Sequence, residues 1–158
     1  MKRVISLALV VVLCLSLCAC GGAVKLTEEK VKNALADCEG ALSMEKAGKK
    51  VVSFTYVVKD INADDLMDRQ YTYKAISLLA SGNTGKMTFG HFKVLNAVLP
   101  LLQIDVLLGG NKKIEYVDVM VDKVLGIICD GKTENYGGWT VSAVVDQDAD
   151  SITIKVVS

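Results

Sequence analysis

The chain has 158 residues, 51% of them apolar, and its 18 basic and 18 acidic side chains give a formal net charge of zero. This length allows one domain of ordinary size. The charge balance argues against a nucleic-acid-binding surface, which needs a basic excess. A large apolar fraction with a single proline excludes a mainly disordered chain.

The N-terminus has the layout of an export signal. Lys2 and Arg3 precede an apolar run, residues 4–19, whose conventionally polar side chains are Ser6 and Ser16. Two cations followed by a short apolar run are typical of a secretory signal peptide. The run is short for a stable membrane span, which needs about 20 residues. We therefore expect residues 1–19 to be removed as a signal peptide.

The end of this run carries a more specific pattern. Leu17-Cys18-Ala19 leads into Cys20, and Gly21-Gly22 follow it. An aliphatic residue three positions before a cysteine resembles the lipobox of bacterial lipoproteins, although Cys18 is unusual among the small residues found inside that motif. The resemblance covers residues 1–22. It implies that the thiol of Cys20 is lipidated and that Cys20 becomes the first residue of the mature chain.

The lipoprotein interpretation divides the chain into three parts. Residues 1–19 are removed, residues 20–25 form a short lipidated tether, and residues 26–158 form a single globular domain. Loss of two cations with the signal leaves 16 basic residues against 18 acidic ones, a net charge of −2. The lipid would hold the domain on the extracytoplasmic face of the cell membrane. An ordinary cleaved signal peptide and an uncleaved anchor stay open as alternatives.

Two cysteines remain in the exported domain, Cys38 and Cys129. Export would allow a disulfide between them, but nothing in the sequence brings the two residues together. Two buried free thiols, packing as small apolar side chains, are the simpler interpretation.

The first elements of the domain are predicted as a long helix and a strand. Thr27 is a suitable N-cap, and Leu26 and Val31 are spaced as a hydrophobic staple. An apolar stripe at helical spacing extends the predicted helix to about Ala47, before Gly48. Alternating apolar and polar residues predict a strand over 51–59, whose buried face would comprise Val52, Phe54, Tyr56 and Val58.

Three more helices are predicted in the middle of the chain. The first runs from Asp64 to about Ala80 and would bury Leu66, Tyr73, Ile76 and Leu79, although Tyr71-Thr72-Tyr73 would also suit a strand. The second is a core helix over Phe89–Leu108, bent or broken at Pro100, with a membrane-apposed surface as the alternative. The third covers 112–129, where β-branched residues also fit a strand.

The C-terminal part is predicted as a β-hairpin. Apolar residues alternate over 138–146 and again over 151–157, and the acidic stretch from Asp146 to Asp150 links the two strands. Together with 51–59 they would form an antiparallel sheet of about three strands with helices on one face. The predicted fold class is α+β.

The known nucleotide and metal motifs fit the chain poorly. Gly85-Lys86 resembles a phosphate loop, but the glycine and the hydroxyl that such a loop requires at its ends are missing. Asp146, Asp148 and Asp150 begin like an EF-hand loop, but Gly is missing at its sixth position and Glu at its twelfth. An acidic turn is the better interpretation. No cofactor and no metal ligand is predicted.

The remaining candidates are a histidine, an acidic pair and two aromatics. His91 is the only histidine, and nothing in the sequence pairs it with a cysteine nucleophile. Asp64 and Asp65 could serve acid–base chemistry, but helix capping and compensation of the helix dipole explain them more simply. Tyr136 and Trp139 flank two glycines and are candidate ligand contacts, or else Trp139 packs in the core.

These observations predict a lipid-anchored extracytoplasmic lipoprotein whose domain is a non-catalytic binding or interaction module of the cell envelope. It would bind an envelope protein, a peptide or a small ligand through the open face of the sheet or the 131–139 loop. Two alternatives stay open. One is an envelope enzyme, or an enzyme accessory, that uses the carboxylates of Asp64, Asp65 or the 146–150 turn. The other is a structural assembly partner.

Overall fold

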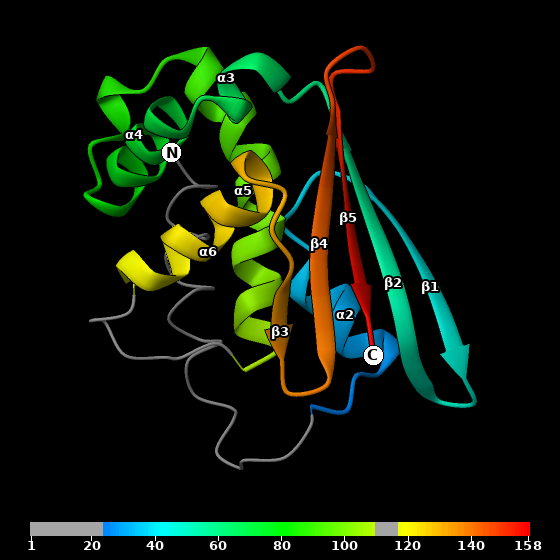
Figure 1. Ribbon diagram of the computed structural model, residues 1–158. Helices are drawn as coiled ribbons and strands as arrows, with labels where there is room; N and C mark the ends of the chain where they lie inside the picture. Colours follow the sequence, from blue (N-terminus) through cyan, green and yellow to red (C-terminus); the bar gives the residue numbers. More distant parts are fainter. Residues whose placement is uncertain (1–23, 110–116) are drawn as a thin grey trace.

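The computed structural model describes residues 24–109 and 117–158, which form a five-stranded antiparallel sheet with helices on one face (Figure 1). The predicted signal peptide and Cys20 lie outside the described residues. The strand order is β1-β2-β5-β4-β3. The strands are β1 (Ala41–Ala47), β2 (Lys50–Lys59), β3 (Glu134–Tyr136), β4 (Trp139–Asp146) and β5 (Ser151–Val157).

The helices cover the buried face of this sheet (Figure 1). They are α2 (Glu28–Ala34), α3 (Ala63–Met67), α4 (Arg69–Ala80), α5 (Phe89–Leu107) and α6 (Val117–Cys129), with a short 3₁₀ turn at Thr84–Lys86. The α+β class is therefore confirmed. The predicted sheet of about three strands was too small, because β1 and β3 extend it at both edges.

The edge strand β1 replaces the second half of the helix predicted over 27–47. The Thr27 side chain caps α2 as expected, but the helix ends at Ala34. The alternating side chains Leu42 and Met44 pair with Tyr56 and Phe54 of β2. Leu42 fits both helical and strand periodicity, so the local pattern was ambiguous there. Strand pairing with β2, a contact between separate segments, favours the extended form.

Gly40 stands where the chain passes very close to β2. A Cβ atom at this position would lie 2.6 Å from a ring carbon of Tyr56 and 2.8 Å from the carbonyl oxygen of Val57. Only glycine allows that approach of the chain to β2. Glycine inside a helix is also unfavourable by about 1 kcal/mol relative to alanine, a signal against a long helix.

The second missed strand, β3, lies in the segment 131–139, which was predicted as a loop. It pairs with β4 through a two-residue turn, in which Gly137 and Gly138 have φ of 53° and 99°. Positive φ at both central positions is the favoured geometry of a tight hairpin. The double glycine was therefore a turn signal between two strands.

The predicted strand 51–59 and the predicted hairpin are confirmed as β2, β4 and β5. Phe54, Tyr56 and Val58 are buried as predicted. Val52, which was predicted to be buried, is only half-buried. Its neighbour Val51 is buried instead, with 3% of its surface exposed. The reason is a shift of the β1–β2 register between Glu45 and Lys46, which changes the face at the start of β2.

The helix predicted over 64–80 is divided into α3 and α4. The break lies at Asp68, whose carboxylate accepts hydrogen bonds from the backbone N–H groups of Gln70 and Tyr71 and so caps α4. Leu66 and Ile76 are buried as predicted, whereas Tyr73 is 50% exposed. The prediction that Tyr73 is buried was wrong, because the break at Asp68 changes which side chains face inward.

Helix α5 passes through Pro100 as one helix rather than two. It packs against α2, α4, α6 and β2, and this packing offsets the lost backbone hydrogen bond. The predicted helix 112–129 is confirmed from Val117 onward, and residues 112–116 lie outside the described residues. Among the described residues, every helix is too short or too polar to span a bilayer.

Replacing Gly40 by alanine tests the close approach of the chain to β2. We expect Gly40→Ala to lower the free energy of unfolding by about 1–3 kcal/mol, because the new methyl group clashes with a backbone carbonyl. Gly85→Ala is the matched control, since a Cβ there meets nothing within 4 Å. Chemical denaturation measures both variants, and equal stabilities would contradict the proposed role of Gly40.

Candidate functional site

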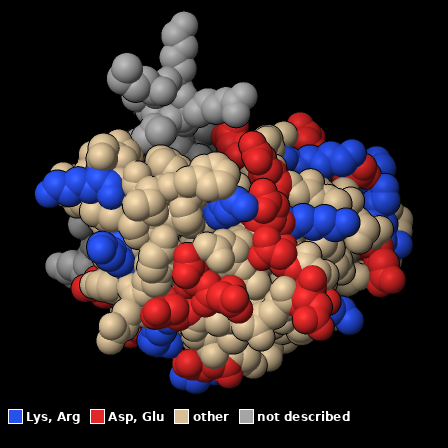
Figure 2. Space-filling view, turned by 90° about the horizontal axis from the view of Figure 1, so that it is seen from above, with Lys and Arg blue, Asp and Glu red and all other residues tan. Residues whose placement is uncertain are grey.

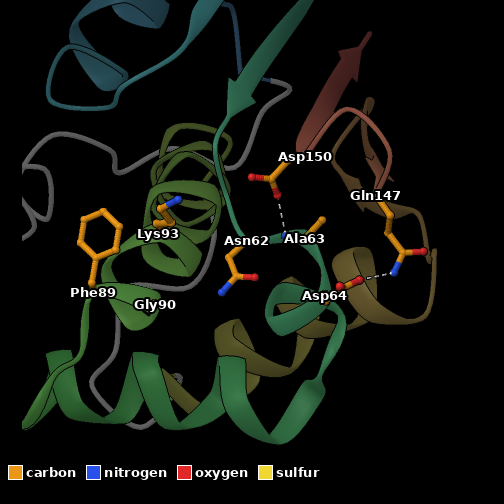
Figure 3. Close-up of a pocket in the computed structure, with 8 residues that line it drawn as sticks. All are labelled: Asn62, Ala63, Asp64, Phe89, Gly90, Lys93, Gln147 and Asp150. Atoms are coloured by element: carbon orange, nitrogen blue, oxygen red, sulfur yellow. Dashed lines mark hydrogen bonds between the residues drawn. The ribbon is translucent and has the colours of Figure 1, made fainter.

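A polar pocket of about 510 Å³ lies at the end of the sheet where β2 leads into α3 and β4 turns into β5 (Figure 3). We call this end, made by residues 59–65, 89–93 and 146–151, the pocket end. Three segments line the pocket: the start of α3, the first turn of α5 and the β4–β5 turn. The lining residues are Asn62, Ala63, Asp64, Phe89, Gly90, Lys93, Gln147 and Asp150.

Two hydrogen bonds attach the β4–β5 turn to α3. The Ala63 backbone N–H donates to Oδ1 of Asp150 at 2.8 Å, and the Gln147 side-chain amide donates to Oδ1 of Asp64 at 2.9 Å (Figure 3). The first bond places a carboxylate at the N-terminus of α3, where backbone donors lack helical partners. The structure thus brings Asp64 and the 146–150 turn, two separate candidates in the sequence, to one pocket.

Backbone strain is concentrated at the same end. In the described residues, the non-glycine residues with positive φ are Asp60, Asn62 and Asp150, at 56°, 57° and 44°. Two of them line the pocket, and Asp60 is paired with the lining residue Lys93. Asp and Asn tolerate this left-handed conformation better than other side chains. Strain of this kind often gathers where a site must be held in a particular shape.

The cationic side of the pocket is already compensated. Lys93 forms an ion pair with Asp60, and its ammonium group lies 5.1 Å from the centroid of the Phe89 ring. The ring itself is 75% exposed. Because Asp60 balances Lys93, the carboxylates of Asp64 and Asp150 give the pocket an excess of negative charge. Figure 2, which looks down on this end, shows acidic side chains gathered across it.

Each of the two pocket carboxylates has an oxygen available. Oδ1 of Asp64 and Oδ1 of Asp150 accept the hydrogen bonds described above. Within the described residues, no protein group donates to Oδ2 of either side chain. The pocket therefore offers two carboxylate oxygens as acceptors, beside the amides of Asn62 and Gln147 and the exposed ring of Phe89.

His91 has a structural place next to this site. The Thr88 backbone N–H donates to Nδ1 of His91, which completes a capping box at the start of α5. The ring is 4% exposed and stacks on Tyr71 at 4.7 Å. Since Nδ1 accepts that bond, Nε2 carries the proton in the neutral ring. No group among the described residues accepts a hydrogen bond from it.

The two cysteines of the domain are free thiols. Burial and the charge of Asp37 raise the pKa of Cys38 to about 11. Burial also raises the pKa of Cys129. A thiol with a raised pKa is a poor nucleophile at neutral pH, because little thiolate is present.

Tyr136 and Trp139, the predicted ligand contacts, are 9% and 4% exposed. The Tyr136 hydroxyl donates to Oδ1 of buried Asp105, and burial followed by this bond raises the pKa of Tyr136. The indole N–H of Trp139 donates to the carbonyl oxygen of Val24 at 2.8 Å. A ligand would reach either ring only if this hairpin opened, so ligand contact by these residues stays a prediction.

The open face of the sheet carries small hydroxyl side chains, placed there by the strand register. Val144, 69% exposed, also lies on this face. Ligand binding on this face stays a prediction. The hydroxyl residues are Ser43, Ser53, Thr55, Thr140, Ser142 and Thr153.

The remaining acids do not assemble a metal site in the part of the chain that the structure describes, where no cluster of three or more His, Cys, Asp or Glu could hold an ion. Asp146 accepts a hydrogen bond from the backbone of Ala149 within the turn. Oδ2 of Asp65 accepts one from the side chain of Asn62.

Four of the larger lining side chains were not predicted as site residues from the sequence. They are Asn62, Phe89, Lys93 and Gln147. A signal was present in the polar break after β2, where Asp60 and Asn62 are residue types suited to positive φ. Phe89 and Lys93 looked like ordinary members of an apolar helix.

Comparison of the chain with protein-family models, with curated proteins and with solved structures finds no match.

Removing the Asp150 carboxylate tests the attachment of the turn to α3. We expect Asp150→Ala to lower the free energy of unfolding by about 0.5–2 kcal/mol through loss of the cap. Its positive φ adds a further cost of about 1 kcal/mol for alanine. Asp150→Asn, which keeps an acceptor and tolerates that φ, should lose less.

Asp148→Ala is the matched control for this loss, because Asp148 is exposed and accepts no hydrogen bond within the described residues. Urea denaturation of the three variants decides the question. If Asp148→Ala lowers the free energy of unfolding as much as Asp150→Ala, Asp150 is not a cap.

Proposed function

We propose that this protein is an extracytoplasmic lipoprotein, held at the cell membrane by a lipid on Cys20, whose domain is a non-catalytic binding module. The lipobox-like stretch that ends at Cys20 supports the anchor. The pocket end supports the binding role, because the pocket is open to solvent and lined by polar groups.

The ligand we propose for the pocket is a small polar molecule with a cationic amine. The observation that carries this proposal is the pair of carboxylates from separate segments, Asp64 and Asp150, which line one pocket. Hydrogen bonds between an ammonium group and a carboxylate are about twice as strong as neutral ones. The exposed face of Phe89 can add contact to an apolar or cationic part of the ligand.

The size of the pocket agrees with this ligand class. Its volume of about 510 Å³ falls within the range of small-molecule sites, roughly 300–1,000 Å³. Five polar side chains from three segments line it, and such convergent groups fix the orientation of a bound ligand. A protein partner would not need a concave site of this kind.

Carboxylate chemistry is the second candidate function. Asp64 and Asp150 line the same pocket, as the acid and base of an enzyme would. Each carboxylate, however, already holds a neighbouring segment in place through a hydrogen bond, a role that suits a rigid binding site. Turnover of an envelope saccharide or peptide by the purified protein, abolished in Asp64→Asn, would favour this second function.

The lipid anchor is tested by metabolic labelling with a fatty-acid analogue. We expect label on the full chain and none on Cys20→Ala, because the lipobox resemblance assigns the acylated thiol to Cys20. Cys18→Ala is the matched control and should keep the label. Label retained on Cys20→Ala would contradict the anchor.

The pocket is tested by calorimetry with glucosamine as a probe and N-acetylglucosamine as its uncharged counterpart. We expect the mature protein to bind the amine in preference. Asp64→Asn, which keeps an acceptor for Gln147, should weaken binding about tenfold, equivalent to ~1.4 kcal/mol. Asp148→Asn is the control and should bind like the unaltered protein. The proposed recognition would be refuted if the protein bound both sugars with equal affinity. It would also be refuted if Asp64→Asn and Asp148→Asn bound glucosamine equally well.

A further inference from the structure

We propose that the end of the domain opposite the pocket docks on anionic lipid headgroups, so that the pocket faces away from the membrane. We call this opposite end the tether end. It consists of residues 24–32, the β1–β2 turn with its flanking residues 45–51, the β3–β4 turn at 137–138 and the C-terminal Ser158. The inference rests on the proposed lipid anchor at Cys20.

Strand register brings these segments to one end of the sheet. Ala47 pairs with Lys50 and Tyr136 pairs with Trp139, so both hairpin turns lie there. The backbone N–H of Ser158 donates to the carbonyl oxygen of Val52. Figure 1 shows the C-terminus, the β1–β2 turn and the β3–β4 turn at the same end of the sheet.

The start of the described chain is held firmly at the tether end. The indole N–H of Trp139 donates to the carbonyl oxygen of Val24 at 2.8 Å. The Val51 backbone N–H donates to the carbonyl oxygen of Leu26 at 3.0 Å. Four peptide steps separate Val24 from Cys20, a reach of at most about 14 Å. A lipid on Cys20 would therefore bring this end, and no other, close to the membrane.

The exposed charge at the tether end is mainly basic. Six exposed lysines gather there, against Glu28, Glu29, Glu45 and the C-terminal carboxylate. Two of the six lysines, Lys32 and Lys46, share Glu28 as partner and lower its pKa to about 2. The six are Lys25, Lys30, Lys32, Lys46, Lys49 and Lys50.

Four of these lysines are available to a partner, since none of them has an acidic partner within salt-bridge distance among the described residues. They are Lys25, Lys30, Lys49 and Lys50. Lys49 and Lys50 project from the tip of the β1–β2 hairpin, where Gly48 has φ of 64°. Clusters of lysines next to a membrane attachment point are attracted to anionic headgroups.

The charge of the other end has the opposite sign. Six aspartates face two lysines, Lys59 and Lys93, at the pocket end, where Figure 2 shows a band of acidic side chains. The six are Asp60, Asp64, Asp65, Asp146, Asp148 and Asp150. The strand β4 separates the two ends by ~24 Å, at about 3.4 Å per residue. This distance exceeds the Debye length of about 8 Å at physiological salt. An anionic surface would therefore attract the tether end without sensing the pocket end.

An anionic membrane suits this surface better than an acidic protein, because the short tether would hold the lysines against the bilayer. The test uses the full lipidated chain in vesicles of phosphatidylcholine, with or without phosphatidylglycerol. A membrane-impermeant amine reagent labels exposed lysines, and mass spectrometry measures each one. Lys74 and Lys86, exposed on α4 and in the 3₁₀ turn, are internal controls.

We expect labelling of Lys49 and Lys50 to fall roughly threefold when phosphatidylglycerol is present. Labelling of Lys74 and Lys86 should stay unchanged. The double variant Lys49→Glu with Lys50→Glu should remove the protection of Lys25 and Lys30, whereas Lys74→Glu should not. Fluorescence of buried Trp139 verifies that both variants fold. Equal labelling in the two kinds of vesicle, or protection that requires an added acidic protein, would overturn the proposal.

Failure of the anchor and failure of the docking give different results. A chain without lipid would not float with the vesicles in a density gradient, which would refute the anchor. A chain that floats with the vesicles, but whose tether-end lysines are labelled equally in both, would refute the docking alone.

Discussion

The antiparallel pairing of β5 with both β2 and β4 is the constraint on which both ends of the molecule depend. It joins the C-terminal segment to a strand formed about a hundred residues earlier in the chain. At one end it sets the β4–β5 turn beside α3, where Asp150 caps the helix and the pocket forms. At the other end it aligns Val51 and Trp139, whose hydrogen bonds hold the start of the described chain. The pocket end and the tether end therefore lie at opposite ends of the sheet.

The charged side chains are also divided between the pocket end and the tether end. The formal charge of the whole chain is zero, yet acidic side chains gather at the pocket end and unpaired lysines at the tether end. Net charge hides such polarity, because opposite excesses cancel in the sum. The proposed cationic ligand and the proposed anionic membrane surface are the two partners that this separation favours. Each proposal can fail without the other.

Much of the fold was accessible from local pattern. The alternation of apolar and polar residues predicted β2, β4 and β5, because one face of each strand is buried and the other is more exposed. The edge strands were missed for different reasons. Leu42 in β1 fits two periodicities, and β3 has three residues, too few to show one. Asp64 and Asp150 were both candidates, but they stand 86 positions apart in the chain. Their meeting at one pocket could not be predicted from local pattern.

The sequence by itself determined features that depend on local pattern, the α+β class and the capping of α2 by Thr27. The export signal and the lipobox-like stretch are also local patterns, and they stay predictions. Only the tertiary structure decided the break at Asp68, the burial of Tyr136 and Trp139, and the assembly of the pocket. The physical reason is the range of the interactions. Helix caps and periodic patterns depend on residues within a few positions of one another. Strand pairing and core burial depend on contacts between distant segments, and these contacts select one of several local conformations of similar energy.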